Sequence, residues 1–367
     1  MSGYRGTNGA ELPSGAHPVV PGSAVGIIAN PMSGRDIRRL VARASVFPNA
    51  EKTNMALRLI AAAGALGVER VHMSTDAMGV AAGVLRAAGR RRPREGRWPE
   101  LAFRELERPS GDAEDTRRLV RQMCERGAAV VVLLGGDGTV RAAAAESGEL
   151  PLLPLSTGTN NAFPEMWEAT VAGAAAALLA TGRVSRAQAT YRAKALRVSC
   201  GSATEIALVD VCVSTVAHVG ARALCEVGTL RELYCAFAEP HAVGLSSIAG
   251  LVAPSGRTHP DGVRVRLAGD GPAPRRVLAP VAPGVLAPVG LLEVASLRPG
   301  ESVTSAVTRG TVAVDGEREL EFGPATPVTV TLTHDGPTVL DVRAALAHAA
   351  EHGLLVTGIQ PTYQEVR

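Results

Sequence analysis

The chain is poor in lysine, in aromatic side chains and in long uncharged apolar runs. Only Lys52 and Lys194 are lysines among 38 basic residues, and no GxxxxGK[ST] motif occurs, so any nucleotide must be bound without a P-loop lysine. Aromatic residues make up 3% of the chain, which gives little sign of a large apolar ligand pocket. No uncharged apolar run reaches the roughly 18 residues that a membrane helix needs, so no membrane span is predicted.

The cysteines, and the histidines between residues 218 and 334, also lack the patterns of metal sites. The cysteines are odd in number and contain no CxxC pair; they are Cys124, Cys200, Cys212, Cys225 and Cys235. This usage is typical of a reducing cytoplasm, where we expect the protein. The histidines at 218, 241, 259 and 334 are scattered, which favours structural roles. His241 stands apart, because the glycine- and serine-rich segment 238–250 around it has no explanation from strand periodicity.

Size and charge set the remaining limits. A chain of 367 residues with 46% hydrophobic and 20% charged residues can bury two ordinary cores, so we expect two domains. The formal charge of +3 implies neither a nucleic acid nor an anionic membrane as a partner. The basic stretch 89–97 contains Pro93 and Gly96 and no aromatic residue, which favours a solvated loop. Residues 1–23 lack the apolar core of a signal peptide and are expected to form a disordered tail.

The most informative stretch is 128–145, in which AAVVVLL runs into GGDGT and then VRAAAAE. The apolar run predicts a buried strand of a parallel sheet, and a helix is expected to begin at Thr139. Glycines let backbone amides approach a ligand, and a helix N-terminus favours negative charge, so the turn suits a phosphate. Asp137 would repel phosphate unless a divalent cation, or a proton to be abstracted, lay between them.

Two further loops follow predicted strands. The strand AVGIIAN from Ala24 ends on NPMSGRD, where Asn30 and Ser33 offer polar groups, Gly34 permits close approach and Arg35 can pair with phosphate. The alternative is an ordinary turn, because Asn-Pro and Ser-Gly are turn dipeptides. The strand 150–155 leads into STGTNN, residues 156–161, in which five of six residues are Ser, Thr or Asn. A helix cap needs only one such residue, so a binding loop is favoured over a capping segment.

The order of the elements predicts the fold class. Helices at 51–63, 77–88 and 112–126 alternate with strands at 68–74 and 101–106, and the helix 164–180 follows the third loop. This alternation is typical of an α/β domain with a doubly wound parallel sheet, predicted here over residues 24–188. From about 191 onward, short alternating runs with glycine and proline turns predict a β-rich second domain, 189–334. The segment 335–367 turns helical again.

Three motifs in this order, NPxSG, GGDGT and STGTNN, resemble the superfamily of NAD kinases, diacylglycerol kinases and sphingosine kinases. Within it, NPMSGRDIRRL and STGTNNAFPEMWEATVAG are most similar to the ATP-NAD kinase-like proteins associated with acetoin catabolism. The resemblance covers about residues 24–182. It implies a nucleotide-binding domain, a β-rich domain that helps form the acceptor site, a cleft between them, and a C-terminal segment that packs on the first domain.

The resemblance also implies roles for particular residues. Asp137 would be the catalytic acid that activates a hydroxyl, with ATP as phosphoryl donor, Mg²⁺ as metal, and NAD or another small hydroxyl compound as acceptor. The nucleotide would be held by residues of all three motifs: Asn30, Ser33, Gly34, Gly135, Gly136, Gly138, Thr139, Thr157, Gly158, Thr159, Asn160 and Asn161. Lipid kinases carry an Asp-Gly-Glu that Asp315, Gly316 and Glu317 resemble, so Asp315 and Glu317 are candidate metal ligands. The alternative for this motif is a hairpin turn.

Two departures from the resemblance leave the acceptor open. VRAAAAE follows GGDGT where diacylglycerol kinases and NAD kinases have an Asn-Glu pair, and no TGSTAY-like loop occurs; Thr308 to Thr311 lacks the serine and tyrosine. Three functions therefore remain: a kinase for NAD or another small molecule in acetoin or diol catabolism, a lipid kinase, and a nucleotide-binding regulatory protein without turnover. The first is favoured because Asp137 is present. A homo-oligomer is compatible with all three.

Overall fold

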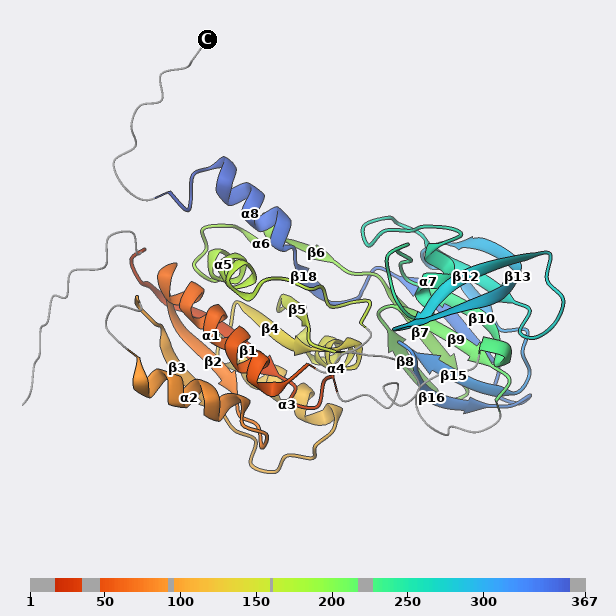
Figure 1. Ribbon diagram of the computed structural model, residues 1–367, viewed down its shortest axis with the longest axis horizontal. Helices are drawn as coiled ribbons and strands as arrows, with labels where there is room; N and C mark the ends of the chain where they lie inside the picture. The colour runs from red at the N-terminus through yellow and green to blue at the C-terminus, as the bar shows by residue number, and fades with distance from the viewer. Residues whose placement is uncertain (1–16, 35–46, 92–95, 159–160, 217–226, 357–367) are drawn as a thin grey trace, which may run out of the picture.

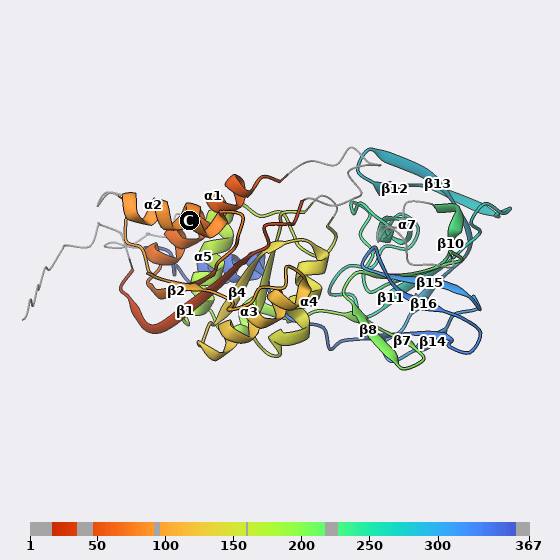
Figure 2. The same ribbon diagram turned by 90° about the horizontal axis from the view of Figure 1, so that it is seen from below.

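The computed structural model describes residues 17–34, 47–91, 96–158, 161–216 and 227–356. The chain forms an α/β part and a β-rich part that lie side by side (Figure 1). Turning the molecule shows the same division, with α4 at the side of the first part that faces the second (Figure 2). In the described part of the chain, no helix is both long and apolar enough to cross a membrane.

The first part is built on a seven-stranded sheet in the order β3-β2-β1-β4-β5-β18-β6. Its strands are β1 (Val20–Ala29), β2 (Val68–Ser74), β3 (Glu100–Arg104), β4 (Val130–Gly135), β5 (Leu152–Ser156), β6 (Thr190–Arg192) and β18 (Thr338–Leu340). Neighbouring strands from β3 to β18 pair in parallel, and β6 pairs antiparallel with β18. This confirms the predicted parallel sheet.

Helices cover both faces of this sheet. They are α1 (Asn49–Ala65), α2 (Val80–Arg90), α3 (Ala113–Glu125), α4 (Asp137–Ser147), α5 (Ala169–Ala180), α6 (Arg186–Ala189) and α8 (Val342–Glu351). Side chains of a strand alternate between faces, and β4 follows this rule. Val130, Val132 and Leu134 pack with α1, α2, α5 and α8, whereas Val131 and Leu133 pack with α3 and α4. Because both faces are covered, all six residues of β4 are buried.

Two predicted element boundaries are wrong by several residues. Residues 20–23 belong to β1 instead of a disordered tail, because the Val20 amide donates to Gly67 and the Gly22 amide to Glu69 of the neighbouring chain segment. Helix α5 begins at Ala169 rather than at Pro164. The chain before it is extended, since the Ser156 amide donates to the carbonyl oxygen of Glu165 over 2.8 Å.

The second part is a sandwich of two antiparallel sheets, of seven strands in the order β12-β13-β11-β10-β9-β15-β16 and of four in the order β14-β17-β7-β8. The larger sheet contains β9 (Asp210–Ser214), β10 (Leu230–Cys235), β11 (Gly262–Leu267), β12 (Arg275–Ala282), β13 (Val285–Leu297), β15 (Gly310–Val314) and β16 (Glu317–Phe322). The smaller contains β7 (Ala195–Cys200), β8 (Ala203–Ala207), β14 (Ser302–Thr304) and β17 (Val328–Thr333). The predicted β-rich second domain is thus confirmed.

The core of the sandwich continues into the first part. Val211 and Val312 of the larger sheet pack with Val198 and Val330 of the smaller one, in the same buried cluster that includes Leu133. The other face of the larger sheet is covered by α7 (Ser246–Gly250), whose Ile248 is fully buried. After the sandwich, β18 and α8 return to the first part, where α8 packs against α5 and α6 (Figure 1).

Candidate functional site

The glycine turn after β4 is the start of the site. Helix α4 begins at Asp137, two residues before the predicted start at Thr139, with Gly136 as its N-cap. As a glycine, this N-cap provides no side-chain cap for the helix. The first amides of a helix have no partner within the helix, so the N-terminus of α4 presents N–H groups and the positive end of the dipole to a ligand.

The sheet brings the three predicted loops to one edge. Ala29 pairs with Leu134, and Gly135 pairs with Ser156, so β1, β4 and β5 end side by side. The ladder continues one residue further, since the Asn30 amide donates to Leu134 over 2.9 Å. Because carboxyl ends of parallel strands are where open α/β sheets bind ligands, this edge is the expected position for a site.

Side chains of the first loop contact the other two loops directly. The Asn30 Nδ2 donates to the Thr139 hydroxyl over 2.8 Å, and the Ser33 hydroxyl lies 2.8 Å from that of Thr157. Gly34 adopts a φ of 82°, and a Cβ at this position would lie 3.1 Å from the carbonyl oxygen of Thr157. Gly34 is therefore required both for its conformation and for the close approach.

Lys52 holds the backbone of the first loop, a role that the sequence did not predict. Its side chain is fully buried in α1, and its Nζ donates to the carbonyl oxygens of Asn30 and Ser33 over 2.9 and 2.8 Å. A third bond goes to Asn49 Oδ1 over 3.1 Å. A buried ammonium must be hydrogen-bonded to be tolerated, and here the bonds set the position of the NPxSG backbone.

The third loop folds over the glycine turn. Asn161 Nδ2 donates to the Ser156 hydroxyl over 2.9 Å. A Cβ placed on Gly136 would lie 2.7 Å from Asn161 Oδ1, and one placed on Gly158 would lie 2.5 Å from the same side chain. These two glycines leave the space that Asn161 occupies. Three predicted binding residues, Arg35, Thr159 and Asn160, lie outside the described residues.

Asp137 is oriented by the segment that follows this loop. Its carboxylate accepts the Phe163 amide over 2.8 Å and the Ala162 amide over 3.1 and 3.2 Å. These two backbone donors hold the carboxylate in one orientation at the N-terminus of α4. A carboxylate at a helix N-terminus is favoured by the dipole, so the arrangement is stable without a ligand.

The Asp-Gly-Glu motif forms a hairpin turn in the second part, between β15 and β16, near the first turn of α4. Asp315 and Gly316 both have positive φ, 50° and 79°, as a tight two-residue hairpin requires. The buried Asp315 carboxylate accepts the amides of residues 208–210, the shortest at 2.8 Å from Val209. Burial raises the pKa of Asp315 to about 7; Arg141 opposes this rise and Asp137 adds to it.

Glu317 is the member of this motif that approaches the glycine turn. A Cβ on Gly138 would lie 3.8 Å from Glu317 Oε1, and Glu317 Oε2 lies 3.9 Å from an Arg141 Nη2 on α4. The structure thus brings the β-rich part to the first turn of α4. Asp315 and Glu317 differ in their surroundings, because Asp315 is enclosed by backbone amides whereas the Glu317 side chain is one third exposed.

Arg257 links the two parts of the molecule and has no motif that could have revealed it. It donates to the carbonyl oxygens of Phe163 and Ala162 over 2.8 and 2.6 Å, and so holds the same two residues whose amides bind Asp137. Its guanidinium lies over the rings of Phe163 and Phe237, at 5.5 and 4.4 Å from their centroids.

Glu239 completes the surroundings of Arg257, and His241 lies outside them. Glu239 Oε1 is 3.5 Å from the guanidinium Nε. His241 Nε2 lies 3.7 Å from Glu239, but its side chain is 82% exposed. The segment 238–250 therefore contributes Glu239 to the contact between the two parts, while the histidine that stood out in the sequence lies at the surface.

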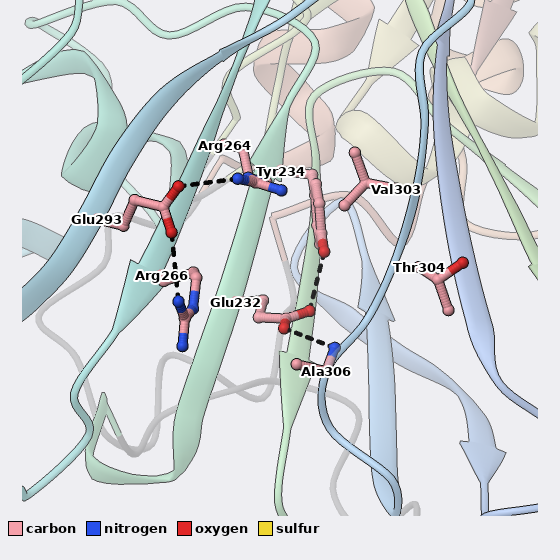
Figure 3. A pocket seen from close by; sticks show the side chains of 8 residues that line it. All are labelled: Glu232, Tyr234, Arg264, Arg266, Glu293, Val303, Thr304 and Ala306. Atoms are coloured by element: carbon pink, nitrogen blue, oxygen red, sulfur yellow. Dashed lines mark hydrogen bonds and ion pairs between the residues drawn. The ribbon is translucent and has the colours of Figure 1, made fainter.

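A separate pocket of about 240 Å³ lies within the second part (Figure 3). It is lined by Glu232, Tyr234, Arg264, Arg266, Glu293, Val303, Thr304 and Ala306, none of which is a predicted site residue. Glu293 pairs with Arg264 and Arg266, and Glu232 accepts the Tyr234 hydroxyl and the Ala306 amide. Glu293 is thus paired with the two arginines, whereas Glu232 is held by neutral donors.

Comparison with known proteins agrees with the two-part architecture. The ATP-NAD kinase N-terminal domain model matches residues 25–184, and the acetoin catabolism protein X C-terminal domain model matches residues 194–335. Acetoin catabolism protein X of Cupriavidus necator is 43% identical over 343 residues, which cover 92% of this chain and 95% of that protein. The chain belongs to the acetoin catabolism protein X family.

A solved structure also resembles the chain. It is the crystal structure of an NAD kinase from Archaeoglobus fulgidus in complex with ATP, with 14% sequence identity and a TM-score of 0.37. The match covers 78% of this chain and 99% of that chain. In this chain, the contacts among Asp137, Phe163 and Arg257 lie at the junction between the two matched domains.

Proposed function

We propose that this protein is an ATP-dependent phosphotransferase that phosphorylates an alcohol group of NAD or another small molecule. The observation that carries the proposal is the position of Asp137, which is the first residue of α4 and is oriented by two backbone amides. The name of the relative from Cupriavidus necator supports a role linked to acetoin or diol catabolism. The match to the ATP-NAD kinase N-terminal domain supports ATP as donor.

The residues of the three loops fit a nucleotide. The amides at the start of α4 suit phosphate oxygens, and Gly135, Gly136 and Gly138 place no side chain between these amides and a ligand. Asn30, Ser33, Thr139 and Thr157 form a connected set of polar groups at the same edge of the sheet. We assign Gly34, Gly158 and Asn161 to the shape of this edge and retain Thr159 and Asn160 as predicted contacts.

The carboxylates near α4 fit a magnesium ion, which takes oxygen ligands. Glu317 would hold it, and when bound it would neutralise charge that develops on the transferred phosphoryl group. Asp315, also predicted as a metal ligand, has another task in this proposal. Three backbone amides surround its carboxylate, which supports a positioning role that fixes the turn carrying Glu317.

The chemistry assigned to the chain's own residues is proton removal and orientation. As the acceptor oxygen forms a bond to the γ-phosphorus of ATP, the bond from that phosphorus to ADP breaks and the hydroxyl proton moves to an Asp137 carboxylate oxygen. Arg257 holds the carbonyl oxygens of Ala162 and Phe163, and the amides of the same two residues hold Asp137. Contact between the β-rich part and the first part thereby helps to place the carboxylate.

A screen of acceptors tests this function. Purified protein with ATP and Mg²⁺ is incubated with NAD, NADH, acetoin, the diol formed by its reduction, or diacylglycerol, and both ADP and phosphorylated product are quantified. Asp137→Asn serves as the blank for contaminating phosphatases. We expect one water-soluble acceptor to give product in equal amount to ADP. Product from diacylglycerol alone would identify a lipid kinase, and ATP binding without any product would identify a regulatory nucleotide-binding protein.

A further inference from the structure

The last turn of α8 carries a cluster of potential metal ligands that the sequence analysis missed. His348, Glu351 and His352, here called the α8 cluster, each offer one ligand atom, and these atoms lie within 4.8 Å of one another. The spacing i, i+3 and i+4 places all three on one side of a helix. Ala345 and Ala349 are buried against the first part, whereas Glu351 and His352 at the end of the helix are exposed, so the α8 cluster is open to solvent.

The two imidazoles are already arranged side by side. Their centroids are 4.0 Å apart with an interplanar angle of 32°. His352 Nδ1 lies 2.9 Å from the carbonyl oxygen of His348, and since a carbonyl only accepts, this nitrogen carries the proton. The lone pair of His352 is therefore on Nε2, away from the backbone. Metal-binding histidines generally donate their second ring nitrogen in this way, which fixes the ring for coordination.

The position at the end of the helix favours a cation. Helix α8 runs from Val342 to Glu351 with His352 as its C-cap, so the α8 cluster lies at the negative end of the helix dipole. Glu351 and His352 are exposed and His348 is half-buried, which leaves the α8 cluster accessible from solvent. Glu351 adds the negative charge that two neutral imidazoles lack.

We propose that the α8 cluster is a binding site for a borderline divalent transition metal, with Zn²⁺ as the representative ion. Imidazole nitrogens with one carboxylate suit Zn²⁺, Ni²⁺ and Cu²⁺, whereas Mg²⁺ and Ca²⁺ prefer oxygen ligands. A pair of histidines four residues apart on a helix is a known zinc-binding arrangement. Three protein ligands leave at least one coordination position open to water or to another molecule. The site is independent of the proposed nucleotide site, whose candidate metal ligands are carboxylates.

Metal titration of the full chain, purified without a histidine tag and freed of metal by a chelator, tests the proposal. The buffer contains millimolar Mg²⁺, which occupies oxygen-only sites. Calorimetry is expected to show one Zn²⁺ site, and Co²⁺ is expected to give visible absorption of a low-coordinate nitrogen site. His348→Ala and His352→Ala should each weaken Zn²⁺ binding at least about tenfold, and Glu351→Gln by a smaller factor.

Control measurements distinguish the loss of a metal ligand from the loss of helix α8. Alanine is the best helix former, so both histidine variants are expected to keep α8, which circular dichroism and the melting temperature without metal can verify. His259→Ala removes another exposed histidine, one outside the α8 cluster, and should leave the affinity unchanged. Zinc should raise the melting temperature of the wild type but not of the double variant His348→Ala/His352→Ala. A double variant that binds Zn²⁺ as tightly as the wild type would overturn the proposal.

Discussion

Arg257 donates through Nη1 to the carbonyl oxygen of Phe163 over 2.8 Å. The amide of Phe163 in turn donates to Asp137 over 2.8 Å, so one residue connects a side chain of the second part to the candidate catalytic acid of the first. The Arg257 side chain is only 15% exposed, and it also lies over two aromatic rings. Its contacts should therefore stabilise the protein more than a surface ion pair does. The position of Asp137 thus depends on both parts of the molecule.

Arg257→Leu is expected to destabilise the protein by about 1–3 kcal/mol, because two carbonyl oxygens lose a charged donor and Glu239 loses its partner. Turnover should fall as well, since the peptides that orient Asp137 are released. The matched control is Arg343→Leu. Both arginines contact Glu165, at 3.8 and 3.3 Å, but the Arg343 side chain is 74% exposed, so we expect a loss below about 1 kcal/mol. Urea denaturation measures both, and equal losses would contradict the linking role of Arg257.

Gly136→Val is expected to abolish most ATP binding while the fold survives. A Cβ at this position lies 2.7 Å from Asn161 Oδ1, so the branched side chain must displace Asn161 and cover the first amides of α4. The control is Gly89→Val, since a Cβ at Gly89 meets nothing within 4 Å. Calorimetric titration with ATP compares the two. Unchanged affinity in a folded Gly136→Val protein would mean that this turn is only structural.

Lys194 is expected to make stability depend on alkaline pH. Its Nζ donates to the carbonyl oxygens of Gly256 and Asp261, which anchors the loop that carries Arg257. Burial lowers the pKa of Lys194 from 10.5 to about 8, against an opposing effect of Asp261. Between pH 8 and 10.5 the unfolded chain binds more protons than the folded one, so the contribution of Lys194 to stability rises with pH and is lost as pH falls to 8.

The magnitude can be measured as a difference between two proteins. The wild type should gain up to about 3 kcal/mol over Lys194→Met between pH 8 and 10.5. Subtracting the two curves removes the titration of cysteines and tyrosines that both proteins share. Chemical denaturation at a series of pH values gives these curves. Parallel curves over this interval would show that Lys194 titrates normally and that its burial costs nothing.

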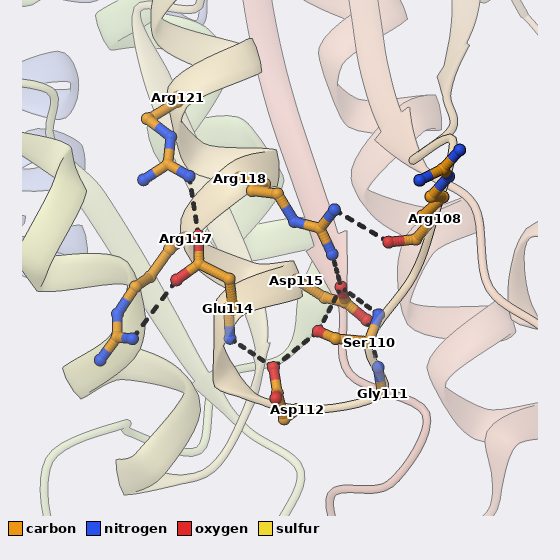
Figure 4. Close-up of polar contacts among 9 residues, drawn as sticks. All are labelled: Arg108, Ser110, Gly111, Asp112, Glu114, Asp115, Arg117, Arg118 and Arg121. Carbon is orange, nitrogen blue, oxygen red and sulfur yellow. Dashed lines mark hydrogen bonds and ion pairs between the residues drawn. The ribbon is translucent and has the colours of Figure 1, made fainter.

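The sequence predicts elements well where a local pattern and the tertiary contacts agree. The helix expected at 112–126 is α3, and its start is visible in the residues themselves (Figure 4). Asp112 is the N-cap and accepts the Glu114 amide over 2.9 Å, while Asp115 accepts the amides of Ser110 and Gly111. Asp112 thus satisfies one orphan amide of the helix, and the acidic residues Glu114 and Asp115 of the first turn complement the dipole, so no distant contact is needed to define this end.

Boundaries that depend on distant residues were predicted less well. Pro164 suits a first helical turn, yet α5 begins at Ala169, because the segment before it pairs with the end of β5 and Glu168 accepts the amides of Thr170 and Val171. The start of β1 at Val20 depends in the same way on residues 67–69. Such pairings join segments far apart in sequence, and no local pattern records them.

Some contacts of the candidate site could be anticipated from the sequence, and others could not. The contact between Asn30 and Thr139 could be anticipated, because both follow neighbouring parallel strands. Lys52 could not, since a lysine in an amphipathic helix is usually exposed, and only the structure shows it buried under the first loop. The role of Arg257 could not be anticipated either. It donates to backbone carbonyl oxygens, which every residue has, so no residue type in the sequence marks its partners.

The most direct test of the account is a paired measurement of ATP affinity and turnover in Asp137→Asn. The substitution keeps the size of the side chain and removes the charge that accepts a proton. With an acceptor identified in the screen, we predict that turnover falls by roughly 10²–10⁴-fold, while ATP affinity is unchanged or higher because repulsion of phosphate is lost. A variant that turns over as fast as the wild type would contradict the catalytic role of Asp137.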